Sequence, residues 1–431
     1  MRKKQHQLWA LVVFLCVALT AGAQTTGSVP VVTVVGRNIP GEQDPVYGVV
    51  GGYCDIALAS VVSNPLVCIH TTAKGNQLAR LVNGKPQMLQ GMPDIAIARE
   101  DGAVILNNSG SPAYQWIAPD NTVTNLNEFN LSDGSSVDAL NYFGFTPDGT
   151  ILATGLATKN SSPYYDLLMG EMPSQKWTNI LETPAFGWNL NGGSFRTGTE
   201  ATWAILMDGP LGQAFLARVY YAGPKAGTYK STGIVVPVYN PAAGQLVGNE
   251  TTVAFFDGNS AMVVKESPPG SGTFTQTVLV PPVGTSINDE PGTYQINNRL
   301  DINAAGQLMA RFQGSAPSIK YGSYLVGVIA VADTNMAQPE LTLLADHSTG
   351  LQVCGVPDVG VTNINWFAPV LQADGSILAG CQALDDSYTT RASTIVLIRQ
   401  CQERQAGLAG TIPVCNVNLR PPLRGKGGRA R

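Results

Sequence analysis

The sequence predicts an all-β protein, a single β-propeller of seven four-stranded blades, with six blades as the alternative. Three observations carry this prediction: 47 Gly and 28 Pro in 431 residues, a hairpin pattern that recurs roughly every 55 residues, and little long helical periodicity. The turn-rich composition argues against a helical bundle. The short strands argue against a parallel α/β sheet, and the absence of strict short repeats argues against a β-helix.

The N-terminus has the three parts of a secretory signal peptide. Residues 2–4 are basic, residues 8–19 are apolar, and residues 21–23 (Ala-Gly-Ala) supply a cleavage site of small residues. The apolar run is shorter than the roughly 20 residues of a membrane-spanning helix, which disfavours an uncleaved anchor. We therefore expect residues 1–23 to be removed and the mature chain, starting at Gln24, to be secreted or periplasmic with no transmembrane segment.

Five segments share the hairpin pattern, in which an apolar stretch reaches a turn containing Gly and a second apolar stretch follows. They are residues 95–106, 143–153, 253–264, 300–310 and 369–379. Asp-Gly or a near equivalent supplies the positive backbone angle that a tight hairpin requires. Weaker copies occupy residues 204–219 and, at the front, residues 56–69. Further strand candidates between the turns, such as residues 164–169 and 177–181, bring each unit to the four strands of a propeller blade.

The chain ends suggest how the ring closes. The β-branched run at residues 31–35 is expected to join the last blade as an outer strand, and residues 412–414 are the alternative. The expected organisation is a signal peptide (1–23), an N-terminal segment with the closing strand (24–51), the propeller (52–400), a disulfide-bearing C-terminal extension (401–419) and a basic, disordered tail (420–431).

Six cysteines remain in the mature chain: Cys54, Cys68, Cys354, Cys381, Cys401 and Cys415. An even number in an exported chain predicts disulfides. Pairing of nearest neighbours joins Cys54 to Cys68, Cys354 to Cys381 and Cys401 to Cys415. The alternative joins Cys54 or Cys68 to Cys401 or Cys415 and clips the chain ends together. No C-x-x-C pair is present, so a zinc site is disfavoured, and we expect neither a metal nor a cofactor.

One segment carries a family resemblance. Residues Ile302-Asn303-Ala304-Ala305-Gly306-Gln307 resemble the blade phrase Ile-Asn-x-x-Gly-Gln of secreted bacterial tandem-repeat proteins. The resemblance covers this unit well, whereas other units have Asp-Gly in place of Gly-Gln. It implies an extracytoplasmic β-propeller. Members of these families are mostly of undefined biochemical role, and the phrase builds a hairpin that carries no chemistry to transfer.

Charge and motifs exclude several functions. The formal net charge is −4, and five of the 26 basic residues lie in the tail, so a nucleic-acid groove is not expected. The two mature histidines, His70 and His347, are too few for a three-histidine metal site. Asp346, His347 and Ser348 are of triad types, but triad partners converge through the fold and are rarely adjacent in sequence. The chain also lacks the G-x-S-x-G elbow of α/β-hydrolases.

Two groups of side chains are candidates for a site. Propeller hydrolases and lyases place carboxylates around the axis, and the acids at the ends of blades are Asp94, Asp101, Asp289, Glu290, Asp385 and Asp386. Neighbours on a strand point to opposite faces, so the two acidic doublets are better explained as solvated turns. A stacking platform for sugar or peptide would use Tyr114, Trp116, Tyr142, Trp177, Trp188, Trp203, Tyr220, Tyr221 and Trp366. Packing between blades explains these rings equally well and is the commoner role of buried rings.

The expected function is an exported, non-catalytic binding or interaction scaffold. We expect a monomer that holds a protein or carbohydrate ligand with loops on one face, and no catalytic residue is assigned. The alternative is an extracytoplasmic carbohydrate-active hydrolase or lyase whose carboxylates converge on the propeller axis. A third hypothesis is a cell-surface structural module whose basic tail contacts acidic envelope polymers.

Overall fold

The computed structural model describes residues 28–38, 55–57, 66–71, 75–82, 85–91, 95–98, 103–107, 114–126, 139–145, 150–159, 162–171, 176–184, 200–208, 213–236, 246–257, 260–280, 286–287, 290–291, 293–318, 322–354, 361–372, 374–385, 390–405 and 411–414. Within these ranges the chain is all-β, with one α-helix, α2 (His347–Cys354), and one short 3-10 helix, η1 (Gly223–Lys225). None of its described helices has the length and apolar character needed to cross a membrane. The chain divides into two compact units, Met1–Val31 with Arg399–Arg431, and Val32–Ile398.

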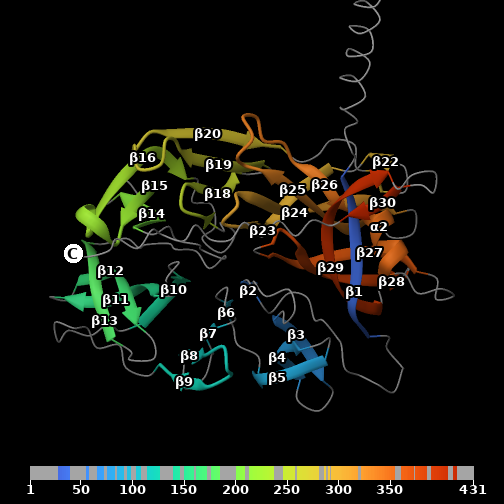
Figure 1. Ribbon diagram of the computed structural model, residues 1–431, viewed down its shortest axis with the longest axis horizontal. Coiled ribbons are helices and arrows are strands. Elements are labelled where there is room, and N and C mark those ends of the chain that lie inside the picture. Colours follow the sequence, from blue (N-terminus) through green and yellow to red (C-terminus); the bar gives the residue numbers. More distant parts are fainter. Residues whose placement is uncertain are drawn as a thin grey trace, which may run out of the picture. The chain divides into compact units, whose positions relative to one another are not determined.

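The strands form small antiparallel sheets that follow one another along the chain (Figure 1). In chain order they are β3 (Leu66–Thr71), β4 (Gly75–Val82) and β5 (Lys85–Gly91); β6 (Ile95–Ala98), β7 (Val104–Asn107), β8 (Tyr114–Ile117) and β9 (Val123–Asn125); β10 (Ala139–Phe145), β11 (Ile151–Lys159), β12 (Ser162–Glu171) and β13 (Lys176–Pro184); β14 (Ala201–Asp208), β15 (Gln213–Tyr220) and β16 (Thr228–Val236); β17 (Val247–Gly248), β18 (Thr252–Asp257), β19 (Ser260–Glu266) and β20 (Phe274–Leu279); β23 (Thr293–Ile302), β24 (Gln307–Ser318), β25 (Gly322–Asp333) and β26 (Thr342–Ala345); and β27 (Val361–Leu371), β28 (Ile377–Asp385) and β29 (Thr390–Gln405).

The remaining strands are short or belong to the chain ends. β21 (Ser286–Ile287) and β22 (Glu290–Pro291) pair with each other, and β2 (Asp55–Ala57) runs parallel to β6. β1 (Ser28–Asn38) contains the predicted closing strand and β30 (Thr411–Val414) contains its alternative. Both pair with β29.

The predicted hairpins are largely confirmed. All five segments form antiparallel strand pairs, namely β6–β7, β10–β11, β18–β19, β23–β24 and β27–β28. Gly306 and Gly375 have the positive φ that the turn requires, at 84° and 83°. The hairpin predicted over residues 56–69 is wrong. Its first half lies in β2, which pairs with β6, and its second half lies in β3, which pairs with β4.

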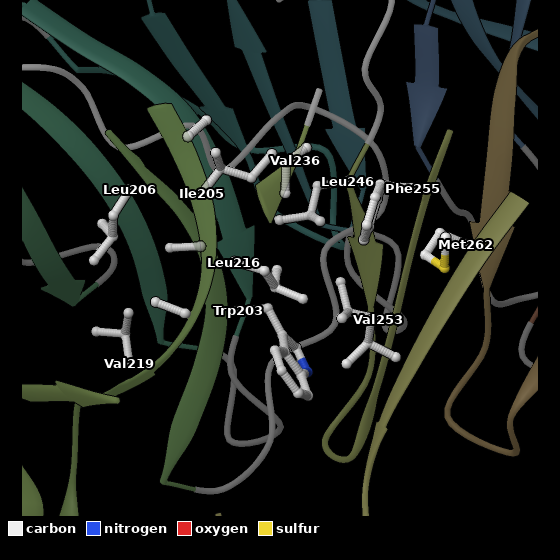
Figure 2. Packing of buried hydrophobic residues seen from close by; sticks show 14 of the residues in the cluster. Trp203, Ile205, Leu206, Leu216, Val219, Val236, Leu246, Val253, Phe255 and Met262 are labelled. Carbon is white, nitrogen blue, oxygen red and sulfur yellow. The ribbon is translucent and has the colours of Figure 1, made fainter. Parts of the chain in front are cut away.

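Apolar side chains pack between neighbouring sheets, as the alternation of the strands requires. One cluster combines residues of the β14–β16 and β17–β20 sheets, including Trp203, Leu216, Val253 and Phe255. Figure 2 shows Leu216 and Trp203 facing Val253, Phe255 and Met262. A second cluster combines the β17–β20 and β23–β26 sheets, and a third combines the β23–β26 and β27–β29 sheets. These three clusters form the part of the described core that lies between the four sheets from β14–β16 to β27–β29.

Buried side-chain amides link the first turns of three successive sheets. Asn249, between β17 and β18, accepts from the Thr252 N–H through Oδ1 at 2.9 Å and donates from Nδ2 to the Asn303 carbonyl at 3.0 Å. Asn303, between β23 and β24, accepts from the Gln307 N–H at 3.0 Å and donates to the Gln372 carbonyl, between β27 and β28, at 3.4 Å. Each asparagine therefore closes its own turn and also bonds to the next one.

Candidate functional site

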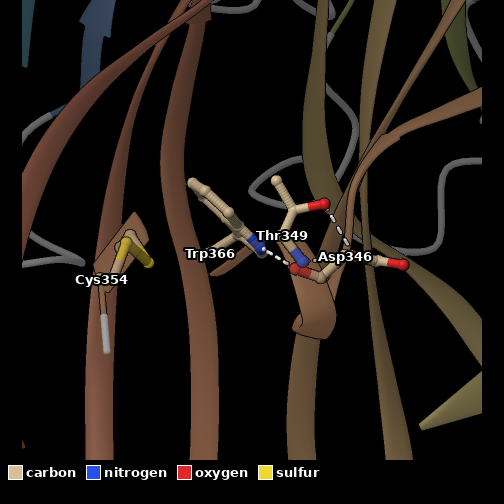
Figure 3. The surroundings of a disulfide bond; sticks show 5 residues. Asp346, Thr349, Cys354 and Trp366 are labelled. Carbon is tan, nitrogen blue, oxygen red and sulfur yellow. Dashed lines mark hydrogen bonds between the residues drawn. A yellow bond between two sulfur atoms is a disulfide. The ribbon is translucent and has the colours of Figure 1, made fainter. Parts of the chain in front are cut away.

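The structure places four of the six predicted cysteines. Cys354, the last residue of α2, forms a disulfide with Cys381 on β28, which confirms the predicted pair; their Cα atoms are 6.2 Å apart. Both are fully buried, and Figure 3 shows the surroundings of the disulfide at Cys354. Cys401 on β29 is buried and also disulfide-bonded. Cys68 lies on β3, without a described side chain, and Cys54 and Cys415 lie outside the described residues.

Next to this disulfide, Asp346 holds the start of α2 in place through hydrogen bonds. The Asp346 carboxylate caps α2, since Oδ1 accepts from both the N–H and the hydroxyl of Thr349 at 2.9 Å. The Asp346 carbonyl accepts from the Trp366 indole N–H at 2.7 Å (Figure 3). His347 begins the helix, and its side chain lies outside the described part. The carboxylate next to His347 in sequence is thus used as a helix cap.

Of the six candidate acids, only Asp385 has a described side chain. It ends β28 and is buried. Glu290 lies on β22 without a described side chain, and Asp94, Asp101, Asp289 and Asp386 lie outside the described residues. His70 lies on β3, also without a described side chain. Among the residues that the structure describes, no three His, Cys, Asp or Glu side chains gather as metal ligands.

The candidate aromatic rings pack inside the protein. Trp177, Trp203 and Trp366 are fully buried, and Tyr114, Trp116, Tyr220 and Tyr221 are buried as well. Tyr142 lies on β10 without a described side chain, and Trp188 lies outside the described residues. A solvent-facing platform built from the seven buried rings is therefore excluded, and their role is packing between and within sheets.

A buried ion pair, which the sequence did not indicate, lies beside Trp203. Arg218 on β15 and Glu266 at the end of β19 are 4% and 2% exposed, and Arg218 Nε lies 3.8 Å from Glu266 Oε2. The guanidinium is 4.7 Å from the centre of the Trp203 ring, and it donates from Nη2 to the Glu250 carbonyl. Burial lowers the pKa of Arg218, and the Glu266 carboxylate opposes that shift.

Trp203 beside the pair and Glu266 within it each have a further anchoring contact. Trp203 donates its indole N–H to the Asn249 carbonyl at 3.0 Å, and Glu266 Oε1 accepts from the Gly272 N–H at 2.8 Å. The ion pair thus joins the β14–β16 sheet to the β17–β20 sheet. These contacts make it a structural connection between sheets.

Two sheets expose an edge strand with apolar side chains to solvent, namely β16 and β20. Each ends its sheet, and no described strand pairs with its outer edge. Both carry exposed apolar side chains: Tyr229 and Val235 on β16, and Val278 on β20 with Val280 just after it. Open edges of this kind can accept a further strand unless the sequence prevents it.

The β16 edge is irregular. Its register with β15 shifts between Phe215 and Ala217, and Gly233 has a φ of 74°. The Gly233 N–H donates to the Ser231 hydroxyl at 3.1 Å, and the Ile234 N–H donates to the Thr232 hydroxyl at 3.2 Å. Irregular register and local hydroxyl acceptors both disfavour the docking of another strand.

The β20 edge is regular and uncharged. Six consecutive residue pairs, from Ala261↔Leu279 to Glu266↔Phe274, join it to β19 without a shift, and residues 274–280 contain no charged side chain. The Thr273 carbonyl accepts from Ser267 on the β19 side at 3.0 Å. Because backbone groups alternate in direction along a strand, those of Gln276 and Val278 point away from β19. Within the part of the chain that the structure describes, this edge therefore offers unpaired backbone hydrogen-bonding groups beside apolar side chains, and it is the candidate binding site.

No protein family model matches this chain, and no curated protein matches it either. Solved structures show distant likeness. A structure from a study of two prolyl endopeptidases has a TM-score of 0.44 and 11% identity over 78% of this chain, which spans only 45% of that protein. The periplasmic gluconolactonase of Pseudomonas aeruginosa has a TM-score of 0.38 and 12% identity over 76% of this chain and 93% of its own. The N-terminal domain of Nup159 has a TM-score of 0.38 and 9% identity over 87% and 97%.

Proposed function

We propose that the protein is an exported, non-catalytic interaction scaffold: a single seven-bladed β-propeller that binds an extended polypeptide segment along the β20 edge. The observation that carries the proposal is the contrast between the irregular β16 edge and the regular, uncharged β20 edge. Proteins normally protect long exposed edges with charges, prolines or bulges, and β20 has none of these. An edge left open in this way is the feature used by proteins that bind peptides by strand addition.

Three features support the scaffold. The sheets follow one another along the chain, and apolar clusters fill the spaces between neighbours, as blades of a propeller do. The described buried polar groups, such as Arg218, Glu266 and Asn303, bond to neighbouring sheets. The buried Cys354–Cys381 disulfide suits an oxidising compartment outside the cytoplasm.

The site can be disabled without touching the core. Gln276 is exposed and its backbone N–H points away from β19, so Gln276→Pro removes one edge donor but no bond of the existing sheet. Gln276→Thr is the matched control because it keeps the N–H and suits a strand. Circular dichroism of both variants checks that the fold is unchanged.

A phage-displayed library of random eight-residue peptides provides the binding assay. We expect residues 24–431 and the Gln276→Thr variant to enrich uncharged, β-branched peptides, and the Gln276→Pro variant to lose them. Peptides that bind the Gln276→Pro variant equally well would contradict the proposal. Turnover of a polysaccharide panel by the same preparation would instead support the hydrolase or lyase alternative.

A further inference from the structure

The two ends of the β20 edge differ in charge. At its start, Lys230 of β16 lies over Gly272, so closely that a side chain at Gly272 would overlap its ammonium group. Lys265 of β19 lies opposite Thr275 and reaches Asn335 Oδ1, at 3.2 Å, on the other side of the sheet. The start of the strand is thus flanked by two cations, and Lys230 is exposed to solvent.

The acid closest in sequence to this end is already engaged. Glu266 accepts from the Gly272 N–H and pairs with Arg218, and it is only 2% exposed. Its charge therefore balances the buried guanidinium, and among the described residues no acid pairs with Lys230 at the surface.

The other end of the edge is apolar. Val278 is 52% exposed and Val280 is 62% exposed, and both lie on the face of the strand that carries Phe274. Phe274 packs edge-on against Trp203, with ring centres 5.9 Å apart, so the strand is fixed at its start and presents its two valines to solvent.

We infer that the segment bound at the β20 edge is a polypeptide strand with a carboxylate at one end and a β-branched or aromatic residue six to eight positions away. This inference rests on the proposed function and adds the chemistry of the partner. A strand advances about 3.4 Å per residue, so this spacing sets the carboxylate beside Lys230 when the apolar residue lies beside Val278 or Val280. Backbone bonds provide the affinity, while charge and apolar contact fix the register and direction.

The probes are three fluorescein-labelled peptides that differ only in their first residue. Their common sequence is X-Thr-Gln-Thr-Gln-Thr-Val-Thr-Val, with X as Glu, Gln or Lys, and binding to residues 24–431 is measured by fluorescence polarisation at 20 and 300 mM salt. We expect the Glu peptide to bind roughly two- to fivefold more tightly than the Gln peptide at low salt, since exposed ion pairs are weak, and the difference to vanish at high salt. The Lys peptide should bind most weakly.

Two variants test whether Lys230 is the source of the preference for the Glu peptide. Lys230→Gln should remove the preference for the Glu peptide and leave binding of the Gln peptide unchanged. Lys176→Gln, which removes an exposed lysine from β13 in another sheet, should leave the preference intact.

The outcomes separate the two proposals. Equal binding of the three peptides to the wild type, lost in Gln276→Pro, would overturn the partner chemistry and leave strand addition standing. Failure of every peptide to bind would overturn both. A dimer seen by sedimentation that dissociates in Gln276→Pro would make a second copy of the chain the occupant, which also overturns the inference.

Discussion

Two junctions between neighbouring sheets bury arginine in different ways. At the ion-pair junction, between β14–β16 and β17–β20, Arg218 is 4% exposed and meets Glu266. At the disulfide junction, between β23–β26 and β27–β29, Arg311 is only partly buried and donates from Nε to the Trp366 carbonyl at 2.7 Å. Both arginines lie on the second strand of a sheet and reach a carbonyl of the next one.

The first junction shows what a fully buried arginine needs. A guanidinium removed from water requires a counter-ion as well as hydrogen-bond acceptors, and Glu266 supplies that counter-ion for Arg218. The first junction therefore depends on a charge balance. The second is tied covalently by the disulfide of the adjoining helix α2.

The largest effect should come from removing the tryptophan at the centre of each junction. Trp203→Ala and Trp366→Ala should each lower the free energy of unfolding by about 3 to 5 kcal/mol, because both rings are fully buried. We expect Trp203→Ala to cost more, since Arg218 loses its ring contact as well. Urea denaturation measures both. An equal loss in Trp203→Phe would show that the indole hydrogen bond, and not packing, dominates.

Neutralising the carboxylate tests the charge balance directly. Glu266→Gln should destabilise the protein by roughly 3 kcal/mol, because it leaves the buried Arg218 without a counter-ion. The double variant Arg218→Met with Glu266→Leu should be much less destabilised than the single variant, since no buried charge is left unpaired. If the double variant were the less stable of the two, the guanidinium would matter for its hydrogen bonds and not for its charge.

Opening the disulfide should have a smaller effect, confined to the second junction. Cys354→Ser with Cys381→Ser should reduce the free energy of unfolding by about 2 to 4 kcal/mol, as expected for a loop whose ends are 27 residues apart. Hydrogen exchange should increase in α2 and not in β15. Increased exchange at β15 would show that the two junctions are energetically coupled.

The smallest effect lies in an exposed turn away from both junctions. Asp120 accepts from the Thr122 N–H at 2.9 Å, and this bond, with a weaker one from the Thr122 hydroxyl, lowers the pKa of Asp120. The stabilisation is therefore complete above the unfolded-state pKa and is lost as the pH falls through the folded-state pKa. Thr122→Val should raise the pKa of Asp120 part of the way to its ordinary value. An NMR titration that finds no change would assign the whole shift to the backbone.

The sequence was informative where the signal is local. Turn glycines such as Gly306 and Gly375 located the hairpins because few other residues tolerate a positive φ. The Cys354–Cys381 pair followed from the short loop between its members. The hairpin predicted over residues 56–69 failed because the three-residue strand β2 pairs with β6, a choice that local turn residues do not encode.

The features that join sheets were not predictable from the sequence. Arg218 and Glu266 lie in different sheets, with nothing in either strand to indicate the other, and only the packing of the two sheets brings them together. The β20 edge was likewise not predicted, since a strand is recognised as an open edge only when its neighbours are known.

The amide links between turns also bear on synthesis. The chain is made from its N-terminus, so Asn249 emerges 54 residues before its acceptor at Asn303, which in turn precedes Gln372 by 69 residues. Until the following unit has been translated, each amide lacks the carbonyl it bonds to in the finished protein. These links can therefore form only in chain order during synthesis, and a chain truncated after β20 would lack the carbonyl that accepts from Asn249.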